Sequence, residues 1–203
     1  MNRVNSGYWL AVTGLFFAGS TNAAGEPPMV SAKSGMQVSP VVSMGLTTGG
    51  DTIATYRISY LGVEYDTDVT LGGNFFIYGG ARFFWPRTGL GIIAQGGAFI
   101  GGVTDDESSA DLSRWPIEAI GFYEFGRLRL GLGVTRHIAP KFEEKGIGDA
   151  RIDFEDAAGT VYQAEYLLGN FTMGLRHVAI DYRYRNATLD ADHWGFFGSF
   201  RFL

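Results

Sequence analysis

Apolar and polar residues alternate with a period of two through most of this 203-residue sequence. Successive side chains of a β-strand point to opposite faces, so the alternation predicts strands, and helical periodicity is nearly absent beyond the N-terminal segment. Eight segments carry the pattern, and each supplies the roughly 9–11 residues that a tilted transmembrane strand needs. These segments are Gln37–Thr48, Val69–Phe84, Thr88–Gly101, Leu112–Phe125, Arg127–Ile138, Ile152–Leu168, Phe171–Tyr184 and Asp192–Leu203.

The links between these segments alternate strictly between short and long. The short links are Trp85–Gly89, Gly126 and Leu168–Asn170, and the long polar ones are Gly49–Asp68, Gly102–Asp111, Ala139–Arg151 and Arg185–Ala191. Outer-membrane barrels show this pattern, with short periplasmic turns and long outer loops, and an even strand number places both termini in the periplasm. The sequence therefore predicts an all-β fold, an eight-stranded antiparallel up-and-down transmembrane β-barrel that is closed and has both termini periplasmic.

The N-terminal segment has the features of a cleavable signal peptide. Arg3 supplies a positive start, Tyr8–Ala18 is an apolar run, and Thr21 and Ala23 occupy the −3 and −1 positions of a cleavage site. The run is shorter than the roughly 20 apolar residues of a spanning helix. We expect residues 1–23 to be the signal peptide, residues 24–36 a periplasmic N-terminal segment, and residues 37–203 the barrel.

The last strand raises the question of which solvent its aromatic side chains face. In "HWGFFGSFRFL", one face carries Trp194, Phe196, Phe200 and Phe202, and the other carries His193, Phe197, Ser199 and Arg201. An exposed aromatic strand edge in water would promote aggregation. The stretch therefore fits a closing strand that pairs with Gln37–Thr48, turns its aromatic face to lipid and serves as an assembly signal.

Composition narrows the classes of function. The net charge of −5 argues against a nucleic-acid partner, since such proteins need a basic surface. The absence of cysteine excludes disulfides, thiolate metal sites and a lipid-modified N-terminal cysteine. The charged fraction of 18% is below the roughly 25% of soluble domains, as a lipid-facing exterior requires.

Polar side chains on the other strand faces should fill the lumen, because eight strands enclose a space just wide enough for side chains. The expected polar network consists of Arg82, Arg114, Glu118, Arg127, Arg129, Gln163, Glu165, Arg176 and Arg201, with Thr135 nearby. Buried charges of opposite sign should pair, because an isolated buried charge is costly. The apolar residues Ile180 and Tyr182 fall on the face of their strand that is otherwise polar, which suggests a bulge near Ala179.

Several stretches of this sequence resemble a known family. The stretches "GGDTIAT", "SRWPIEAIGFYEFGRLRLGLGVTRHIAPKF", "DFEDAAG" and "MGLRHVAIDYRY" are similar to small bacterial outer-membrane β-barrel proteins, described as having an outer membrane protein β-barrel domain. The resemblance covers about Gln37 to Leu203 and implies the fold and location without a settled activity. The last strand resembles the signal read by the barrel assembly machinery, although such strands usually end on Phe and this one ends on Leu203.

The enzymatic alternatives, both lipid A-modifying, each require a histidine in the catalytic set. A lipid A deacylase would place Ser two residues after His on one strand, and here that position after His177 is Ala179. A palmitoyltransferase-like set could draw on His137, Asp105, Ser108 and Ser109, whose spacing matches no recognised pattern. The histidines His137, His177 and His193 lack the spacing of a metal site, so no metal and no cofactor are expected. The acidic run Asp105–Ser109 could bind a divalent cation but is more typical of a solvated loop.

The sequence thus predicts a structural or interaction protein of the Gram-negative outer membrane, exported through a cleavable signal peptide. Its expected partners are outer-membrane lipid, lipopolysaccharide and, during insertion, the barrel assembly machinery. A narrow channel or a conduit for a small or hydrophobic ligand is the first alternative, and a lipid A-modifying enzyme is the second. The oligomeric state is left open.

Overall fold

Eight antiparallel strands close into a single barrel. The computed structural model describes residues 35–60, 63–104, 109–146 and 149–202. In space the ring runs β6-β5-β4-β1-β13-β10-β9-β7, and pairing of β6 with β7 completes it. The barrel strands are β1 (Gln37–Thr48), β4 (Asn74–Trp85), β5 (Leu90–Thr104), β6 (Ser109–Phe125), β7 (Leu128–Lys145), β9 (Ala157–Leu168), β10 (Phe171–Ala179) and β13 (His193–Arg201). Each strand pairs with its neighbours in sequence, so the topology is up-and-down, as predicted.

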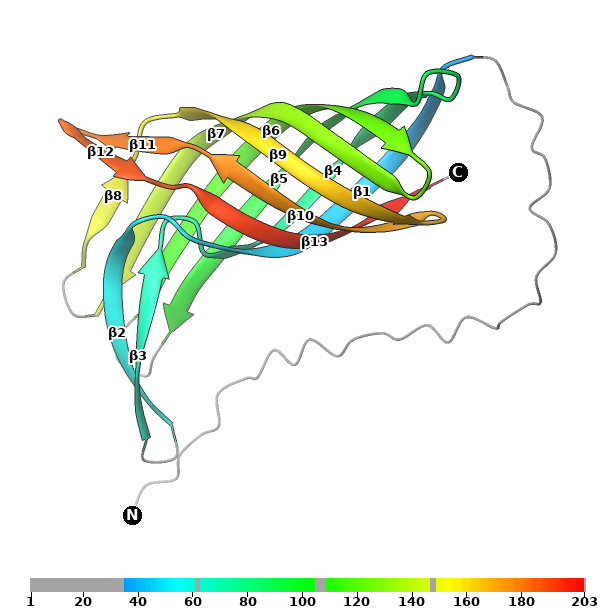
Figure 1. Ribbon diagram of the computed structural model, residues 1–203. Coiled ribbons are helices and arrows are strands. Elements are labelled where there is room, and N and C mark those ends of the chain that lie inside the picture. Colours follow the sequence, from blue (N-terminus) through cyan, green and yellow to red (C-terminus); the bar gives the residue numbers. More distant parts are fainter. Residues whose placement is uncertain (1–34, 61–62, 105–108, 147–148, 203) are drawn as a thin grey trace. The chain divides into compact units, whose positions relative to one another are not determined.

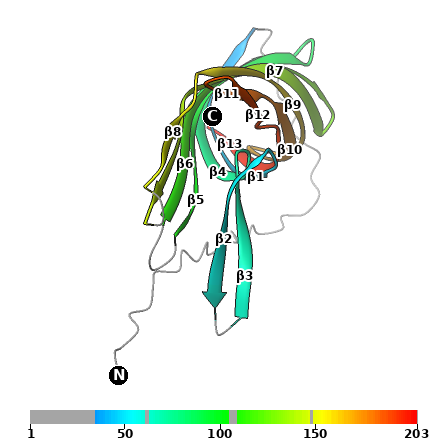
Figure 2. The same ribbon diagram turned by 90° about the vertical axis from the view of Figure 1, so that its left-hand side faces the viewer.

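The last strand closes the barrel onto the first. β13 pairs antiparallel with β1, from Val41 opposite Arg201 to Thr48 opposite Trp194. Figure 2 looks along the barrel and shows the strands as a ring. Closure matters because an open edge would leave backbone groups without partners in lipid. The prediction that the aromatic C-terminal stretch pairs with Gln37–Thr48 is confirmed.

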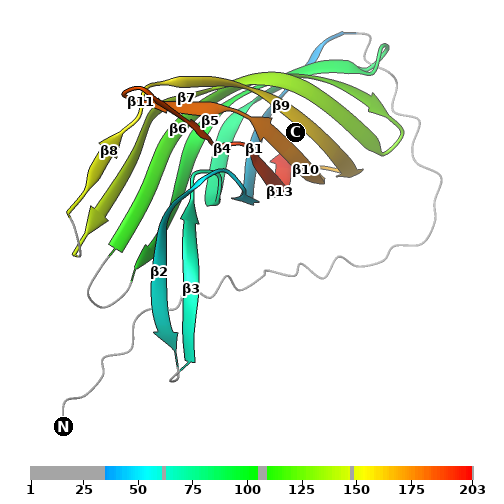
Figure 3. The same ribbon diagram turned by 60° about the vertical axis from the view of Figure 1, so that its left-hand side comes forward.

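The two ends of the barrel differ, and we name them by their connections. Three tight turns lie at the turn end, between β4 and β5, β6 and β7, and β9 and β10, where β1 also begins and β13 ends. The long links lie at the loop end and contain further strands (Figure 3): β2 (Thr52–Tyr60), β3 (Val63–Thr70), β8 (Arg151–Asp153), β11 (Asp181–Tyr184) and β12 (Ala187–Asp190). The predicted alternation of short and long links is confirmed.

Three expected strands are interrupted at the loop end, Phe171–Tyr184 among them by Ile180 between β10 and β11, and parts of the expected loops are structured. Residues 71–73 separate β3 from β4, and residues 154–156 separate β8 from β9. The link 49–68 contains most of the β2–β3 hairpin. The backbone bond from Gly72 N–H to Gly49 O closes the base of this hairpin, between the segments that connect it to β1 and β4. Alternating residues continue through these breaks, which is why the sequence suggested longer uninterrupted strands.

A bulge does exist, but it lies in β7 and the prediction of one near Ala179 was wrong. Val178, Ile180 and Tyr182 are all buried, so the inward parity of β10 continues unbroken into β11. In β7 the register shifts: Ser113 pairs with Lys141 and Trp115 with Ile138, which leaves one extra residue on β7. Ala139 takes a positive φ of 47° there. Beyond it the inward side chains change from odd to even numbers, and Phe142 enters the interior.

The outer surface of the barrel is apolar. Large hydrophobic side chains are exposed along every barrel strand, among them Leu46, Ile77, Ile92, Ile117, Leu132, Val134, Leu175 and Phe196. Trp85, Tyr123, Phe125, Tyr166, Phe200 and Phe202 are exposed near the turn end, and Trp115 and Trp194 nearer the loop end. Aromatic girdles at both rims of an apolar band mark the interfaces of a membrane barrel. In the part of the chain that is described, no helix is long and apolar enough to cross a membrane.

Candidate functional site

The interior of the barrel is the candidate site, because it gathers nearly all of the predicted charged residues. Inward positions alternate with lipid-facing ones along each strand, so polar residues at every second position converge on one axis. From turn end to loop end the contents change from ion pairs, through a carboxylate-centred cluster and a histidine pair, to an apolar plug.

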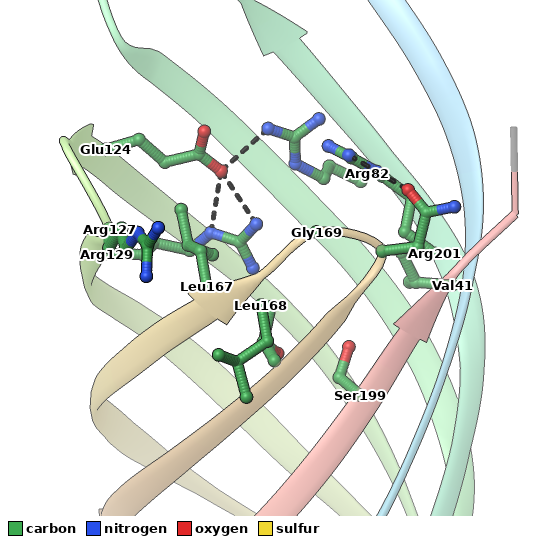
Figure 4. A pocket seen from close by; sticks show the side chains of 12 residues that line it. Val41, Arg82, Glu124, Arg127, Arg129, Leu167, Leu168, Gly169, Ser199 and Arg201 are labelled. Carbon is green, nitrogen blue, oxygen red and sulfur yellow. Dashed lines mark hydrogen bonds and ion pairs between the residues drawn. The ribbon is translucent and has the colours of Figure 1, made fainter. Parts of the chain in front are cut away.

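A chain of ion pairs crosses the turn end. Glu124 Oε1 accepts hydrogen bonds from Arg82 Nη2 at 2.7 Å and from Arg129 Nε and Nη2 at 2.9 and 2.7 Å (Figure 4). Arg129 Nη1 continues the chain to Glu165 Oε2 at 2.9 Å, and Gln163 and Thr172 donate to the same carboxylate. Four strands, β4, β6, β7 and β9, are joined in this way.

Aromatic rings cover the guanidinium groups of this chain. The Arg82 guanidinium carbon lies 4.0 Å from the centre of the Phe84 ring, and that of Arg129 lies 4.7 Å from the centre of Phe122. Phe84 and Phe122 stack on each other at 6.0 Å. Such cation–π contacts partly replace the water that a buried guanidinium has lost.

Glu118 is the centre of the middle cluster. Arg176 Nη2 donates to Glu118 Oε1 at 2.5 Å, the Tyr78 hydroxyl donates to the same oxygen at 2.9 Å, and Gln95 Nε2 donates to Oε2 at 2.8 Å. Glu118 and Arg176 are each only 2% exposed. Buried carboxylates are stable only when their lone pairs are satisfied, and here β4, β5 and β10 supply the donors from two sides of the lumen.

The third part holds two histidines that lie far apart in the sequence. The rings of His137 and His193 stack with centres 6.2 Å apart, and the Tyr182 hydroxyl lies 2.6 Å from His137 Nδ1. Arg114 lies over the Phe99 ring at 4.3 Å and donates to the carbonyl oxygen of Leu71. Sequence spacing gave no sign of the histidine pair, because it forms only when β7 and β13 curve around the same interior.

An apolar plug follows and extends to the loop end. Its buried side chains are Val69, Leu71, Ala110, Leu112, Ile120, Phe142, Phe154, Ala157, Val161, Val178, Ile180, Tyr182 and Ala191. They come both from barrel strands and from β3 and β11, so the loop-end strands contribute to the core. A lumen largely filled by a polar network was expected from the sequence, and the interior is instead apolar at its loop end.

Seven of the nine predicted lumen residues are buried: Arg82, Arg114, Glu118, Arg129, Gln163, Glu165 and Arg176. Arg201 is half-buried at the turn end, where its Nη2 lies 3.4 Å from Asn170 Oδ1. Arg127 is not brought into the ion-pair network. It lies in the turn before β7, is exposed, and its Nη1 is 3.4 Å from the Tyr166 hydroxyl. Glu124, which the sequence reading missed, takes the central position at this end.

Among the described residues, the histidines of the enzymatic alternatives lie on different sides of the barrel wall. His177 is half-buried on the lipid-facing side, with its ring centre 4.6 Å from that of Trp194, and Ala179 offers no hydroxyl. His137 is fully buried in the lumen, on the other side of the barrel wall. Asp105 and Ser108 lie outside the described residues. No group of three or more His, Asp or Glu among the described residues could hold a metal ion.

A pocket of about 590 Å³ opens at the turn end beside the ion-pair chain (Figure 4). It is lined by Val41, Arg82, Glu124, Arg127, Arg129, Leu167, Leu168, Gly169, Asn170, Thr172, Ser199 and Arg201. A second pocket of about 600 Å³ lies at the loop end, and Glu155, Asp156, Asp181, Asp190 and Asp192 are among its lining residues. One end of the barrel is therefore basic and the other acidic.

A closed eight-stranded barrel with an apolar exterior, aromatic rims and charges buried inside defines an integral β-barrel protein of outer-membrane type. Solved structures with a similar arrangement include Ail, the attachment invasion locus protein of Yersinia pestis, with 12% identity over 83% of this chain and 99% of that chain and a TM-score of 0.48. Ail in complex with the heparin analogue sucrose octasulfate gives 13% identity over 82% and 99%, with a TM-score of 0.46. Neisserial surface protein A gives 10% identity over 83% and 99%, with a TM-score of 0.46.

Ail and Neisserial surface protein A are small eight-stranded outer-membrane barrels, the kind of protein that the sequence resembles. No family model and no curated protein matches the chain.

Proposed function

We propose that this protein is a structural and interaction barrel of the bacterial outer membrane, with a lumen that is filled rather than conducting. The observation that carries the proposal is the packing of the interior. Arg82, Arg114, Arg176, Tyr78, Phe76, Phe99, His137 and His193 are among the side chains with less than 2% of their surface exposed. They come from strands all round the ring and occupy successive levels along the barrel.

The sequence and the apolar surface together support the proposed location. A signal peptide cleaved after Ala23 would export the chain, and the apolar band would then be surrounded by outer-membrane lipid and lipopolysaccharide. The exposed rings of Trp194, Phe196, Phe200 and Phe202 on the closing strand would be read by the barrel assembly machinery. The loop-end strands, with exposed ion pairs such as that of Arg151 with Asp153, would provide contacts that support envelope integrity.

Conductance tests the filled lumen. Purified protein inserted into planar bilayers should give no discrete conductance steps, with an open porin in the same membrane as the positive control. The ion pairs bridging the lumen must break before ions can pass, which is the physical reason for this expectation. Regular steps that persist across preparations would support a narrow channel and overturn the proposal.

Lipid A analysis tests the absence of enzymatic activity. Mass spectrometry of lipid A from cells that produce the protein should match that from cells that produce a His177→Ala variant. His177 stacks on Trp194 and has no hydroxyl two residues on, so no nucleophile is paired with it. Loss or gain of an acyl chain that depends on His177 would identify a lipid A-modifying enzyme instead.

A further inference from the structure

The pocket at the turn end carries more positive charge than its neighbours neutralise. Four guanidinium groups line it, those of Arg82, Arg127, Arg129 and Arg201, against one carboxylate, Glu124. Even when Glu165, the second partner of Arg129, is included, two of the positive charges have no Asp or Glu partner among the described residues. A cluster of like charges around one cavity is unfavourable unless an anion binds there.

Arg82 shows that the excess charge is built into the wall rather than spread over a solvated surface. Its side chain is 1% exposed, and only Nη2 has a partner, Glu124. Arg82 Nε and Nη1 are buried without a hydrogen-bond partner, and so is Nε of Arg201. A buried guanidinium edge without an acceptor costs free energy, and an oxyanion bound in the pocket would supply that acceptor.

Arg201 stands near Arg82 with no carboxylate between them. Figure 4 shows both side chains entering the pocket from different strands, β4 and β13, and the like charges of Arg129 and Arg201 act on Arg82. The amide oxygen of Asn170 is the acceptor found for Arg201, at 3.4 Å. Two guanidinium groups that approach from different directions suit a tetrahedral oxyanion, which offers acceptors on all sides, better than a flat carboxylate.

We propose that the turn-end pocket is a binding site for a phosphate group carried by a small soluble molecule, held by Arg82 and Arg201. The volume of about 590 Å³ exceeds what one inorganic phosphate fills, and it falls within the range of small-molecule sites. Exposed Arg127 lies at the entrance, where it would attract the anion before binding. No covalent step is involved, and the site recognises the ligand by charge and hydrogen-bond geometry.

Calorimetric titration of the full-length protein in uncharged detergent tests the site at constant ionic strength. The probes are inorganic phosphate, glycerol 3-phosphate, acetate and chloride. Saturable binding of either phosphate, with acetate and chloride much weaker, is the expected result. Tighter binding of glycerol 3-phosphate would show that the organic part is also held, and equal binding would assign the site to free phosphate. Binding of all anions alike, or of none, would overturn the proposal.

Variants separate a specific site from general attraction to a basic rim. Arg201→Gln breaks no ion pair among the described residues, so the barrel should fold, and phosphate affinity should fall about tenfold or more. Arg185→Gln at the loop end, where Arg185 lies over the Tyr184 ring, is the matched control and should leave affinity unchanged. Equal losses in both variants, or no loss in Arg201→Gln, would show that Arg201 does not hold the ligand.

Discussion

At the residue scale, the interior is held by carboxylates that each satisfy several donors from different strands. Glu118 receives Arg176, Tyr78 and Gln95, and Glu165 receives Arg129, Gln163 and Thr172. Glu118 links strands on opposite sides of the ring, and Glu165 links β9 to its two neighbours β7 and β10. The loss of one carboxylate therefore leaves several buried donors without a partner, which makes these two positions the most sensitive in the lumen.

Replacement of Glu118 by Gln should destabilise the barrel by about 3–5 kcal/mol, because Arg176 would remain buried without its counter-charge. Heat-dependent gel mobility in detergent measures the change as a lower unfolding temperature. Glu143→Gln is the control: Glu143 pairs with Lys141 at 3.0 Å in a partly exposed position, and such pairs contribute about 0–1 kcal/mol. If both variants unfolded at the same temperature as the wild type, the ion-pair account of the lumen would be wrong.

Asp156 gives the loop end a pH dependence. The backbone N–H of Ala139 donates to Asp156 Oδ1 at 3.0 Å, and this bond, strengthened by Arg136, holds the pKa of Asp156 below its usual range. A carboxyl whose pKa falls on folding stabilises the fold fully above its unfolded value of about 3.9. That contribution is lost as the pH drops through the lower folded value.

We therefore expect the Ala139 amide to be protected from hydrogen exchange at neutral pH and to lose protection below about pH 4, relative to neighbouring amides. NMR in micelles measures this. In an Asp156→Asn variant the step with pH should vanish, since no group titrates there. A wild-type amide whose relative protection stays the same as the pH falls from about 6 to about 2 would contradict the assignment.

At the scale of elements, the strands β4 and β5 approach each other closely where glycines face inward. A Cβ on Gly97 would lie 1.9 Å from the carbonyl oxygen of Ile77, whereas a Cβ on Gly79, on the outer face, would meet nothing within 4 Å. The inward face of a narrow, strongly curved barrel has less room than its outer face. The requirement for glycine therefore depends on whether a position faces the lumen or the outside, and not on which strand it belongs to.

Gly97→Ala should consequently destabilise the barrel by about 1–3 kcal/mol through overpacking, and Gly79→Ala should not. Thermal unfolding in detergent compares the two, and the chemical change is the same in each. Equal effects on both variants would mean that backbone flexibility, rather than space in the lumen, sets the requirement for glycine.

The bulge in β7 shows how one backbone irregularity serves the packing of a whole element. Positive φ at Ala139 shifts the parity of β7 by one residue, so that Phe142 enters the apolar plug. The N–H of Ala139, which the bulge turns out of the ladder, is bound by Asp156 from the following link. Strand prediction ended this segment at Ile138, because period-two alternation alone cannot continue through a one-residue shift.

At the scale of the whole molecule, the barrel has a basic turn end and an acidic loop end, and its orientation in the membrane decides what each end meets. The natural chain has no cysteine, so single cysteines report orientation without background. Asn186→Cys lies in the exposed β11–β12 turn at the loop end, and Arg87→Cys lies in the exposed turn between β4 and β5 at the opposite end.

With the turn end in the periplasm, a membrane-impermeant maleimide should label Asn186→Cys in intact cells and Arg87→Cys only after the outer membrane is permeabilised. Folded barrel mobility on gels confirms that each variant is inserted. The reverse pattern of labelling would place the loop end in the periplasm and would also expose the basic pocket to the outside.

The sequence by itself determined the number of barrel strands, the alternation of turns and loops, and which face of each strand is apolar. These features are local: a two-residue period and a link length can be read without knowing any partner. The segment Gln37–Thr48 was predicted as a strand and is β1, and the aromatic C-terminal stretch contains β13, so these strands could be located from the sequence alone.

Only the tertiary structure decided how the interior is paired. Glu118 and Arg176 are 58 residues apart, and His137 and His193 lie on strands that do not pair with each other. Closure of the ring sets which inward side chains reach the same level of the lumen. Strand parity assigned both Arg127 and Arg129 to the lumen, but only Arg129 enters it. The surplus of positive charge at the turn-end pocket has the same origin, since it depends on four strand ends meeting at one rim.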